Sequence, residues 1–414
     1  MVDSIVWVPD EKECYALAKV TEAGDGGTFT YVLQSSGETK TGSKVYPYDS
    51  KDAGESDLVQ MFNIDTPNII ATLRAHHADG SVYTNVGAKS ILISVNPYRW
   101  LDIYTVDNMR EHYEAFATKE LQPHVYAIAS EAYKALCIDG RSQSIVTSGE
   151  SGSGKTENAK QIFRFLAEIA GSQHTSIDGG ISMQQLLVAS NPLLEAFGNA
   201  KTSRNNNSSR FGKLVTVHFD PSGKIVGSNT RNYLLEKTRC VTVPMNERNY
   251  HVFYQMLTGL PFAMRTPRSL TKVADYPLLN QRGAAVTVDG LDDANECKLM
   301  LASMGELGFA EEEQSVVLDV VSALLHLSNA AFVLDESAKH GNDTAKLKDA
   351  VPVQHASSLL ALEHYSFAGA MTGFKVREAH TALSVSAANK SREAFIAATY
   401  SHLFDWLVQR INKV

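Results

Sequence analysis

The sequence predicts an α/β fold in which a mixed β-sheet is flanked by helices and preceded by a small all-β barrel. Three observations support this prediction. Short β-prone runs separated by turn residues fill residues 5–48. Nearly continuous apolar runs, typical of buried strands, follow at 90–95, 144–147 and 214–219. Apolar residues at helical spacing then dominate the second half of the chain, over 315–327 and 394–411.

The composition is typical of a globular chain with a large core. Hydrophobic residues make up 44% and charged residues 20% of the 414 positions, a length that suggests about two or three domains. The sequence has no apolar run long enough for a transmembrane helix, and its N-terminus lacks the pattern of a signal peptide. The net charge of −8 argues against a dedicated nucleic-acid-binding protein. Four widely spaced cysteines fit neither a zinc site nor a disulfide framework, so we expect a cytoplasmic protein with reduced thiols.

Residues 5–48 are expected to form the barrel. Turn signals such as 24–27 and 36–37 separate its short strands. The polar stretch 49–56 has the composition of a linker. We therefore expect a second domain over residues 58–414, which contains the mixed sheet and its helices.

The apolar run 214–219 is predicted to form one strand of a hairpin. It is followed by Asp220-Pro221-Ser222-Gly223, where proline at the second position and glycine at the fourth suit a type I turn, and then by another β-prone run. The same residues also fit the strand-Asp-x-x-Gly pattern of a Mg²⁺-linked switch, but a hairpin explains them without a metal. The glycine-containing stretch 169–182 is expected to be a flexible surface loop.

A phosphate-binding loop is predicted at residues 149–156, which we call the phosphate loop. Its sequence, Gly-Glu-Ser-Gly-Ser-Gly-Lys-Thr, fits the pattern G-x-x-x-x-G-K-[ST]. Glycines let consecutive backbone N–H groups point at phosphate oxygens, Lys155 supplies a mobile positive charge, and the Thr156 hydroxyl is suited to Mg²⁺. The sequence therefore predicts a bound nucleoside triphosphate with Mg²⁺, whereas the alternative is a Gly/Ser turn without a ligand.

The context of this loop favours the phosphate-binding interpretation. The predicted strand 144–147 precedes it, and a helix follows whose positive N-terminal end attracts anions. The apolar stripe of that helix is expected at Ala159, Ile162, Phe163, Leu166 and Ile169.

A second polar segment, Asn-Asn-Asn-Ser-Ser-Arg-Phe-Gly-Lys at 205–213, lies directly before the predicted strand 214–219. We call it the switch segment. Taken alone, it is typical of a polar surface turn. Together with a phosphate loop, it indicates an element that senses the nucleotide by becoming ordered or disordered.

Residues 149–158 and the switch segment together resemble the myosin motor head. Kinesins share the phosphate loop and the Ser-Ser-Arg core, but they continue with Ser-His where this chain has Phe211-Gly212, so a kinesin-like ATPase is the less favoured alternative. Further stretches are similar to family signatures, at 96–104 (which we call the purine segment), 123–129, 232–237, 247–255 and 403–408. The resemblance covers the whole chain, including the N-terminal barrel.

The resemblance implies an actin-based motor that hydrolyses ATP with Mg²⁺. It implies that Asn96, Pro97 and Tyr104 flank the adenine, with Glu157 nearby. The phosphate-binding residues would be those of the phosphate loop: Gly149, Glu150, Ser151, Gly152, Ser153, Gly154, Lys155 and Thr156.

The same resemblance assigns roles in the switch segment. Thr156 of the loop and Ser209 would coordinate Mg²⁺. Asn205 and Asn207 would reach phosphate oxygens, and Ser208 would lie near the γ-phosphate and the attacking water. Arg210 would form a salt bridge with a glutamate of a second switch. The catalytic set would thus be Lys155, Asn205, Ser208, Ser209 and Arg210.

The family's second switch, Asp-x-x-Gly-Phe-Glu, does not occur in these 414 residues. The relay helix, the lower actin-binding domain, the reactive-thiol helix, the converter and the lever arm are also expected to lie outside them. We therefore expect the 414 residues alone to be inactive, and the alternative function is a truncated fragment that binds nucleotide without hydrolysing it.

The resemblance also implies partners for the complete motor. The actin filament would be its track, and light chains or calmodulin would bind only through the absent neck, so a cytoskeleton-associated location is expected. No nucleic acid and no membrane insertion are expected. Residues 58–414 would include the upper actin-facing helical part, and Glu378 stands one residue short of the acidic position expected in the actin-facing loop.

Several suggestive residues have a structural explanation. His124, His251 and His326 share no metal-ligand spacing and are expected to be packed or capping histidines. Tyr250, Phe253, Tyr254 and Leu257 follow a helical period and are expected in the core, not around a cofactor.

Overall fold

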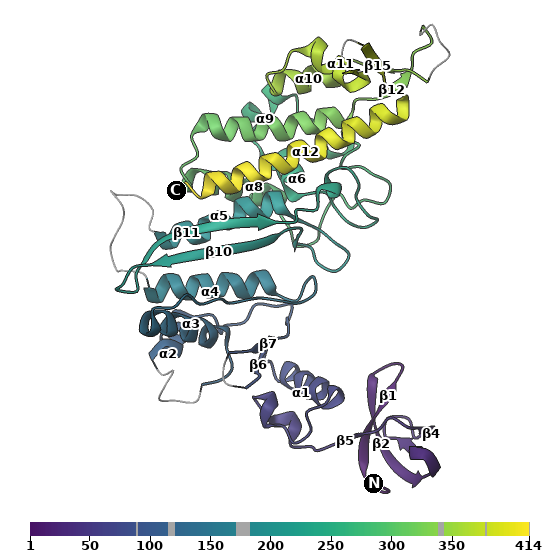
Figure 1. The fold of residues 1–414 in the computed structure, drawn as a ribbon, viewed down its shortest axis with the longest axis vertical. Helices are drawn as coiled ribbons and strands as arrows, with labels where there is room; N and C mark the ends of the chain where they lie inside the picture. Colours follow the sequence, from purple (N-terminus) through teal and green to yellow (C-terminus); the bar gives the residue numbers. More distant parts are fainter. Residues whose placement is uncertain (88–89, 115–120, 171–182, 338–342, 377–378, 414) are drawn as a thin grey trace. The chain divides into compact units, whose positions relative to one another are not determined.

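The computed structural model describes residues 1–87, 90–114, 121–170, 183–337, 343–376 and 379–413 (Figure 1). The chain divides into two compact units, Met1–Ala170 and Gly171–Val414. The predicted loop 169–182 lies outside the described residues except for its first two, which end a helix. Glu378 also lies outside the described residues. Within the described ranges, every helix is too short or too polar to span a lipid bilayer.

The N-terminal strands form an antiparallel sheet of order β4-β3-β2-β1-β5. Their bounds are β1 Ile5–Asp10, β2 Cys14–Ala23, β3 Phe29–Leu33, β4 Thr39–Gly42 and β5 Tyr46–Pro47. The predicted strands are confirmed, but the sheet is open and not a closed barrel, since no pairing joins β4 to β5 among the described residues. The reason is the short β5 edge, where Pro47 has no N–H group to extend the ladder. Val8, Ala18 and Val20 are fully buried beneath the sheet.

The rest of the first unit is mainly helical. Its elements are the short 3₁₀ turns Asp52–Gly54 and Leu58–Gln60, α1 Thr66–Ala78, β6 Tyr83–Asn85, β7 Leu92–Ser94, α2 Val106–Glu114, α3 Val125–Asp139 and α4 Lys155–Ala170. The expected linker is more ordered than its composition indicates. Asp52 is buried, and its carboxylate accepts hydrogen bonds from the backbone N–H groups of Phe62 at 2.6 Å and Asn63 at 3.3 Å.

The apolar runs of this unit form less sheet than predicted. The run 90–95 contains only β7, whose three residues are half-buried and pair with β6. The prediction of a buried strand at 144–147 is wrong, because no strand of the described residues pairs with this extended segment and Val146 is 85% exposed. An apolar run becomes a buried strand only where neighbouring strands accept its hydrogen bonds and helices cover its faces.

The predicted helix after the phosphate loop is confirmed as α4. Its buried face packs with α3 and β6, and Ile162 of the expected stripe lies in it, together with partly buried Leu166 and Ile169. Phe165, which the stripe did not include, is fully buried and stacks on Tyr126 with ring centroids 5.5 Å apart.

The second unit begins with α5 and two strand pairs. Their bounds are α5 Met183–Gly198, β8 Asn199–Ala200, β9 Ser208–Ser209, β10 Gly212–Phe219 and β11 Ile225–Tyr233. Later elements are mostly helical: η4 Lys237–Cys240, α6 His251–Gly259, α7 Phe262–Arg265, α8 Asp293–Glu306, α9 Glu311–Ser328, β12 Phe332–Leu334, β13 Ala345–Leu347, α10 Val351–Leu359, α11 His364–Thr372, β14 Gly373–Val376, β15 Ala379–Ala382 and α12 Val385–Ile411. Two short 3₁₀ turns, Thr266–Arg268 and Val273–Asp275, link α7 to α8.

The predicted hairpin is confirmed as β10 and β11, which pair along their whole length. Its turn is closed by Gly223 N–H donating to the Asp220 carbonyl at 2.9 Å, with Gly223 at a φ of +83°. Burial of β10 on both faces is not observed, because its side chains are exposed or half-buried and Leu214 is 49% exposed. Among the described residues β10 pairs only with β11, so neither a further strand nor a full helical layer covers it.

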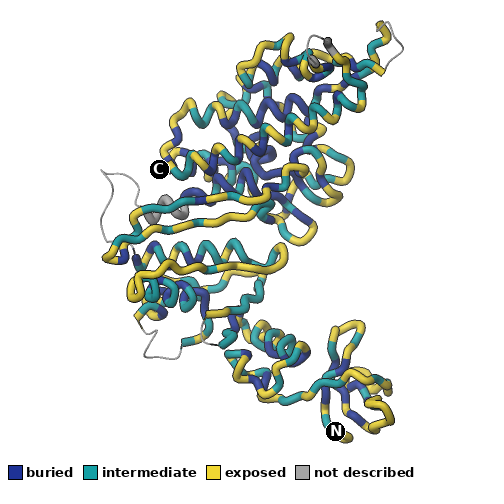
Figure 2. Tube along the Cα trace, viewed as in Figure 1, coloured by how far each residue is buried: buried dark blue, intermediate teal, exposed yellow. Residues whose placement is uncertain are grey.

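One large apolar core holds the second unit together (Figure 2). The long helices α9 and α12, both predicted, lie side by side over it (Figure 1). Tyr400 of α12 is fully buried, donates to the Phe197 carbonyl at 2.7 Å and stacks on Tyr250 and Phe253. These contacts confirm the predicted core residues of α6, which are Tyr250, Phe253, Tyr254 and Leu257.

The three histidines are packed, as predicted. His124 caps α3 by accepting a hydrogen bond from the Tyr126 N–H at 3.1 Å. His251 is buried at the start of α6, and the Nε2 atom of His326 lies 2.8 Å from the Arg268 carbonyl oxygen. No group of three or more metal-ligating His, Cys, Asp or Glu side chains occurs in the described part of the chain.

Candidate functional site

The phosphate loop adopts a backbone that only glycine favours. Gly149, Gly152 and Gly154 have φ values of +148°, +83° and +96°. A Cβ atom at Gly149 would lie 2.6 Å from the Ser153 Oγ atom, so a side chain there would fill the inside of the loop. This tight glycine cradle at the start of the 16-residue helix α4 fits the binding of phosphate oxygens.

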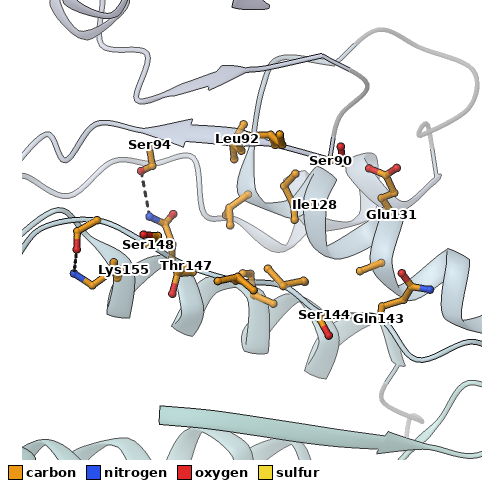
Figure 3. Close-up of a pocket in the computed structure, with 18 of the residues that line it drawn as sticks. Ser90, Leu92, Ser94, Ile128, Glu131, Gln143, Ser144, Thr147, Ser148 and Lys155 are labelled. Carbon is orange, nitrogen blue, oxygen red and sulfur yellow. Dashed lines mark hydrogen bonds between the residues drawn. The ribbon is translucent and has the colours of Figure 1, made fainter. Parts of the chain in front are cut away.

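Lys155 lies folded over its own loop. Its Nζ atom donates to the carbonyl oxygen of Gly149 at 2.6 Å (Figure 3). It also donates to the carbonyl oxygen of Glu150 at 2.7 Å. A phosphate group in the cradle would compete with these two carbonyls for the ammonium group. Thr156 follows directly in the first turn of α4, where a hydroxyl oxygen can serve a hard cation such as Mg²⁺.

The purine segment lies against this loop. The Asn96 side-chain amide donates to the Gly152 carbonyl at 2.7 Å, and its Oδ1 atom accepts from the Tyr98 N–H at 2.9 Å. Pro97 lies between Asn96 and Tyr98 in the sequence. The structure thus brings the predicted purine-binding and phosphate-binding residues of the first unit together.

Glu157, in the first turn of α4, lies near Tyr104. The two residues are close enough for the Glu157 carboxylate to contribute to a raised Tyr104 pKa, whose main cause is burial. The Glu157 carboxylate also forms an ion pair with Lys160, in which the Nζ and Oε1 atoms are 3.1 Å apart. Tyr104, which is predicted to flank the adenine, and Glu157, which is expected nearby, are therefore neighbours in the described structure.

Tyr83 and Asn158 join this neighbourhood, and sequence reasoning gave neither of them a role. The hydroxyls of Tyr83 and Tyr104 are 2.9 Å apart, and Tyr83 donates to the Asn158 Oδ1 atom at 2.7 Å. Asn158 lies in the motif 149–158, which could have drawn attention to it, whereas no local pattern marks Tyr83.

A cluster of aromatic rings packs beside these hydroxyls. His124 lies within 5.6 Å of the ring centroids of Tyr83, Tyr104, His112 and Tyr126. Burial, with the nearby His112, lowers the pKa of His124 to about 3. This imidazole is therefore neutral at physiological pH and serves as a helix cap in an apolar cluster, not as a metal ligand.

A cavity of about 610 Å³ adjoins the phosphate loop within the first unit (Figure 3). It extends between β7, α3 and the extended residues 143–149, and both Lys155 and Asn158 are in its lining. At its far end lies Glu131, whose buried Oε2 atom has no hydrogen-bond partner among the described residues. The cavity is large enough to admit a small ligand next to the loop.

The switch segment in the second unit begins in the turn between β8 and β9, continues through β9 and ends at the start of β10. Ser208 pairs with Ala200 and Ser209 with Asn199. The turn is closed by the Asn205 carbonyl, which accepts from the Thr202 N–H at 2.8 Å, and by the Asn205 Oδ1 atom, which accepts from the Asn207 N–H at 2.9 Å. Asn205 therefore shapes the backbone of a compact turn.

Asn207 is held by two side chains. Its Oδ1 atom accepts from the Asn199 amide at 2.9 Å, and its own amide donates to Glu195 at 3.1 Å. Ser208 is buried and its Oγ atom accepts from Arg210 at 3.1 Å. These predicted phosphate-facing groups are thus brought together with each other in the second unit.

Arg210 forms an ion pair with Glu236, whose Oε2 atom is 2.7 Å from the Arg210 Nε atom. Glu236 belongs to the family-like stretch 232–237, so in this structure the arginine has a partner within the second unit. Burial of Glu236 favours its neutral form, but hydrogen bonds from Arg239 and Arg210 outweigh this and lower its pKa. Sequence reasoning missed this pair because the two residues lie far apart in the chain.

Arg239 links the residues that flank 205–209 on both sides. Its side chain is 2% exposed and pairs with Glu236 at 2.7 Å and Glu247 at 2.8 Å. Glu247 in turn accepts from the Ser203 N–H at 3.2 Å, and Glu236 holds Arg210. One buried guanidinium group thus connects the carboxylates that hold Ser203 and Arg210.

Comparison with known proteins gives consistent matches. A family model described as Myosin head (motor domain) matches residues 55–414. The chain is 36% identical over 419 residues to "Myosin-13" of Arabidopsis thaliana, covering 99% of this chain and 27% of the relative. It is 36% identical over 425 residues to "Myosin-2 heavy chain, non muscle" of Acanthamoeba castellanii, with coverage of 99% and 27%. "Myosin-2" of Saccharomyces cerevisiae is 36% identical over 365 residues, with coverage of 86% and 23%. The chain spans about a quarter of the length of these relatives.

Proposed function

The chain belongs to the myosin head family, and we propose that it forms the ATP-binding part of a motor that hydrolyses ATP with Mg²⁺ and moves along actin filaments. Members of this family are ATPases. The observation that carries the proposal is the glycine cradle at the start of α4, to which Asn96 of the purine segment is hydrogen-bonded. This arrangement supplies backbone donors for phosphates beside residues that suit a purine base.

In this proposal the phosphate loop binds the β- and γ-phosphates. The amides of Gly149 to Gly154 donate to phosphate oxygens, and Lys155 exchanges the carbonyls of Gly149 and Glu150 for phosphate. Asn96, Pro97 and Tyr104 contact the adenine, with Glu157 at its edge. Phosphoryl transfer depends mainly on positioning and on stabilising charge, and these residues supply both.

The hydroxyls of Thr156 and Ser209 would hold the Mg²⁺ ion, which favours oxygen ligands. A bound Mg²⁺ ion would neutralise negative charge on the phosphates. We further propose that Asn205 and Asn207 orient the phosphate oxygens and that Ser208 lies near the attacking water. Arg210 would pass from Glu236 to a glutamate of a second switch when the site closes.

The partner of the complete motor would be the actin filament, which implies a cytoskeleton-associated location, and light chains or calmodulin would bind a neck outside these residues. The 414 residues contain no Asp-x-x-Gly-Phe-Glu second switch. We therefore propose that they bind nucleotide but show negligible turnover alone. Actin-stimulated phosphate release by the 414-residue chain would contradict this part of the proposal.

Substitution of Lys155 tests the nucleotide site. Lys155→Ala should weaken binding of ATP with Mg²⁺ to the 414-residue chain on the order of 10-fold to 100-fold, since a charge-assisted hydrogen bond contributes roughly 1.5–3 kcal/mol. Isothermal titration calorimetry measures this directly, and in the complete motor the same variant should lack ATP hydrolysis.

Lys12→Ala, which removes an exposed lysine of the N-terminal sheet, serves as the control and should bind ATP like the wild type. ATP binding by Lys155→Ala at wild-type affinity would refute the assignment of Lys155. A wild-type chain that binds no ATP would refute the proposed function itself.

A further inference from the structure

A chain of hydrogen bonds connects the purine segment to the phosphate loop. The Tyr104 and Tyr83 hydroxyls are 2.9 Å apart, and the Tyr83 hydroxyl donates to the Asn158 Oδ1 atom at 2.7 Å. The Asn158 amide nitrogen donates to the Gly154 carbonyl at 3.1 Å and to the Ser94 Oγ atom at 3.1 Å. The chain thus runs from Tyr104 through β6 to the first turn of α4.

The chemistry of these groups determines the direction of every bond. The Gly154 carbonyl can only accept, so Asn158 must turn its amide nitrogen toward it and its carbonyl oxygen toward Tyr83. That oxygen cannot donate, and Tyr83 therefore uses its single hydroxyl proton on Asn158. Toward Tyr104, Tyr83 then offers only lone pairs, so Tyr104 must donate its own proton inward.

Burial maintains this direction. Tyr83 is 4% exposed, and burial raises the pKa of Tyr83 and of Tyr104, so both hydroxyls keep their protons at physiological pH. Reversing the chain would remove the hydrogen bond to the half-buried Asn158 oxygen, at a cost of roughly 0.5–1.5 kcal/mol. The Tyr104 hydroxyl accordingly presents only lone pairs to any ligand beside it.

We infer that Tyr83 and Asn158 are positioning residues that make the Tyr104 hydroxyl an obligatory hydrogen-bond acceptor, and that the site therefore favours a base with an amino group at its edge over one with a carbonyl there. The inference rests on the proposed function, because it takes the base to lie beside Tyr104. The adenine 6-amino group can donate to this oxygen. The 6-carbonyl of hypoxanthine would face it with a second acceptor and no proton between them.

Calorimetry with ATP, ITP and inorganic triphosphate, each with Mg²⁺, tests this inference on the full 414-residue chain. The wild type should bind ATP roughly 3-fold to 10-fold more tightly than ITP, the range of one neutral hydrogen bond. In Tyr83→Phe the ratio of ATP affinity to ITP affinity should approach one. The Tyr104 hydroxyl then no longer donates to Tyr83, and its proton can turn toward a carbonyl of the base. Inorganic triphosphate carries no base, so its affinity should not change.

A double-variant comparison examines whether the two tyrosines act as one device. Tyr104→Phe should lower the same ratio, and combining it with Tyr83→Phe should add nothing, because both changes act through one hydroxyl. Tyr126→Phe is the matched control: it removes a hydroxyl of the same aromatic cluster that donates to Gln161 at 3.2 Å, and it should keep the wild-type ratio.

The possible failures are distinguishable. Equal affinity of the wild type for ATP and ITP, or an unchanged ratio in Tyr83→Phe, would overturn the inference while leaving the nucleotide site in place. Loss of triphosphate binding in Tyr83→Phe would also overturn it, since Tyr83 would then support the whole loop and not the base. Failure of the wild type to bind either nucleotide or triphosphate would contradict the proposed function.

Discussion

The phosphate loop and the switch segment carry comparable functional groups but are held in place by different means. The loop is shaped by its own backbone: three glycines have positive φ values, and Lys155 bonds to the carbonyls of its own loop. The switch segment is held by charged side chains from elsewhere in its unit, through Glu195, Glu236, Glu247 and the buried Arg239.

This difference shows how two polar segments of one chain can differ in their dependence on the rest of the fold. A local backbone motif can form wherever a helix follows it, so it is robust to changes in distant residues. A turn that is clamped by buried ion pairs depends on every member of the network, because one lost partner leaves a charge buried without compensation. Distant substitutions in the second unit should therefore loosen the switch segment and leave the loop unaffected.

The largest effect should follow from Arg239→Met. This change leaves Glu236 and Glu247 without their shared buried partner and should lower the free energy of unfolding of the second unit by about 3–5 kcal/mol. Hydrogen exchange measured by mass spectrometry should become faster in residues 201–210 and stay unchanged in the phosphate loop.

Arg110→Met is the control for this experiment. Arg110 pairs with Glu168 at 2.9 Å but is 57% exposed, so its loss should cost less than about 1 kcal/mol. Equal costs for the two arginines, or faster exchange in the phosphate loop of Arg239→Met, would contradict the comparison between loop and switch segment.

A smaller loss is expected for Gly198→Ala. Gly198 ends α5, its carbonyl accepts from the Arg210 N–H at 2.8 Å, and an added Cβ atom would overlap the ring of Phe211. That ring is packed edge-on against the ring of Phe404, with the two ring centroids 4.9 Å apart, and has little room to move. Urea unfolding should show a destabilisation of about 1–3 kcal/mol, the usual cost of overpacking.

Gly305→Ala provides the matched change in α8, where an added Cβ atom meets no heavy atom within 4 Å. Alanine is the better helix former by up to about 1 kcal/mol, so this variant should be as stable as the wild type or more so. If both glycine variants behave alike, packing against Phe211 does not anchor the end of the switch segment.

The smallest effect at neutral pH concerns the first unit, and it grows as the pH falls. Burial lowers the pKa of His124 to about 3 in the folded protein, whereas its ordinary pKa is 6.5. Between pH 3 and pH 6.5 the imidazole therefore takes up a proton when the protein unfolds. Stability should therefore fall as the pH decreases from 6.5 toward 3, by at most about 1.4 kcal/mol per pH unit from this residue.

His124→Asn isolates this contribution, because asparagine can still cap α3 but does not titrate. Urea unfolding at several pH values should show a shallower acid-side slope than in the wild type. His77→Asn, at an exposed position of α1, should retain the wild-type slope. A slope in His124→Asn equal to that of the wild type would show that His124 does not contribute to acid sensitivity.

The sequence by itself determined the features whose signals are local. The glycine spacing of the phosphate loop, the helical periods of α4, α9 and α12, and the Asp220–Gly223 turn were all predicted and observed, because backbone preference and side-chain period act over a few neighbouring residues. The buried face of α6 was predicted for the same reason.

Only the tertiary structure decided which distant groups meet. The run 144–147 has the residues of a buried strand but no pairing partner among the described residues, and the N-terminal strands stop short of a barrel at Pro47. The partnership of Arg210 with Glu236, the central place of Arg239, and the direction of the hydrogen bonds from Tyr104 to Asn158 depend on contacts between residues far apart in the chain. Such contacts leave no periodic or motif signal, because their geometry exists only once the chain has folded.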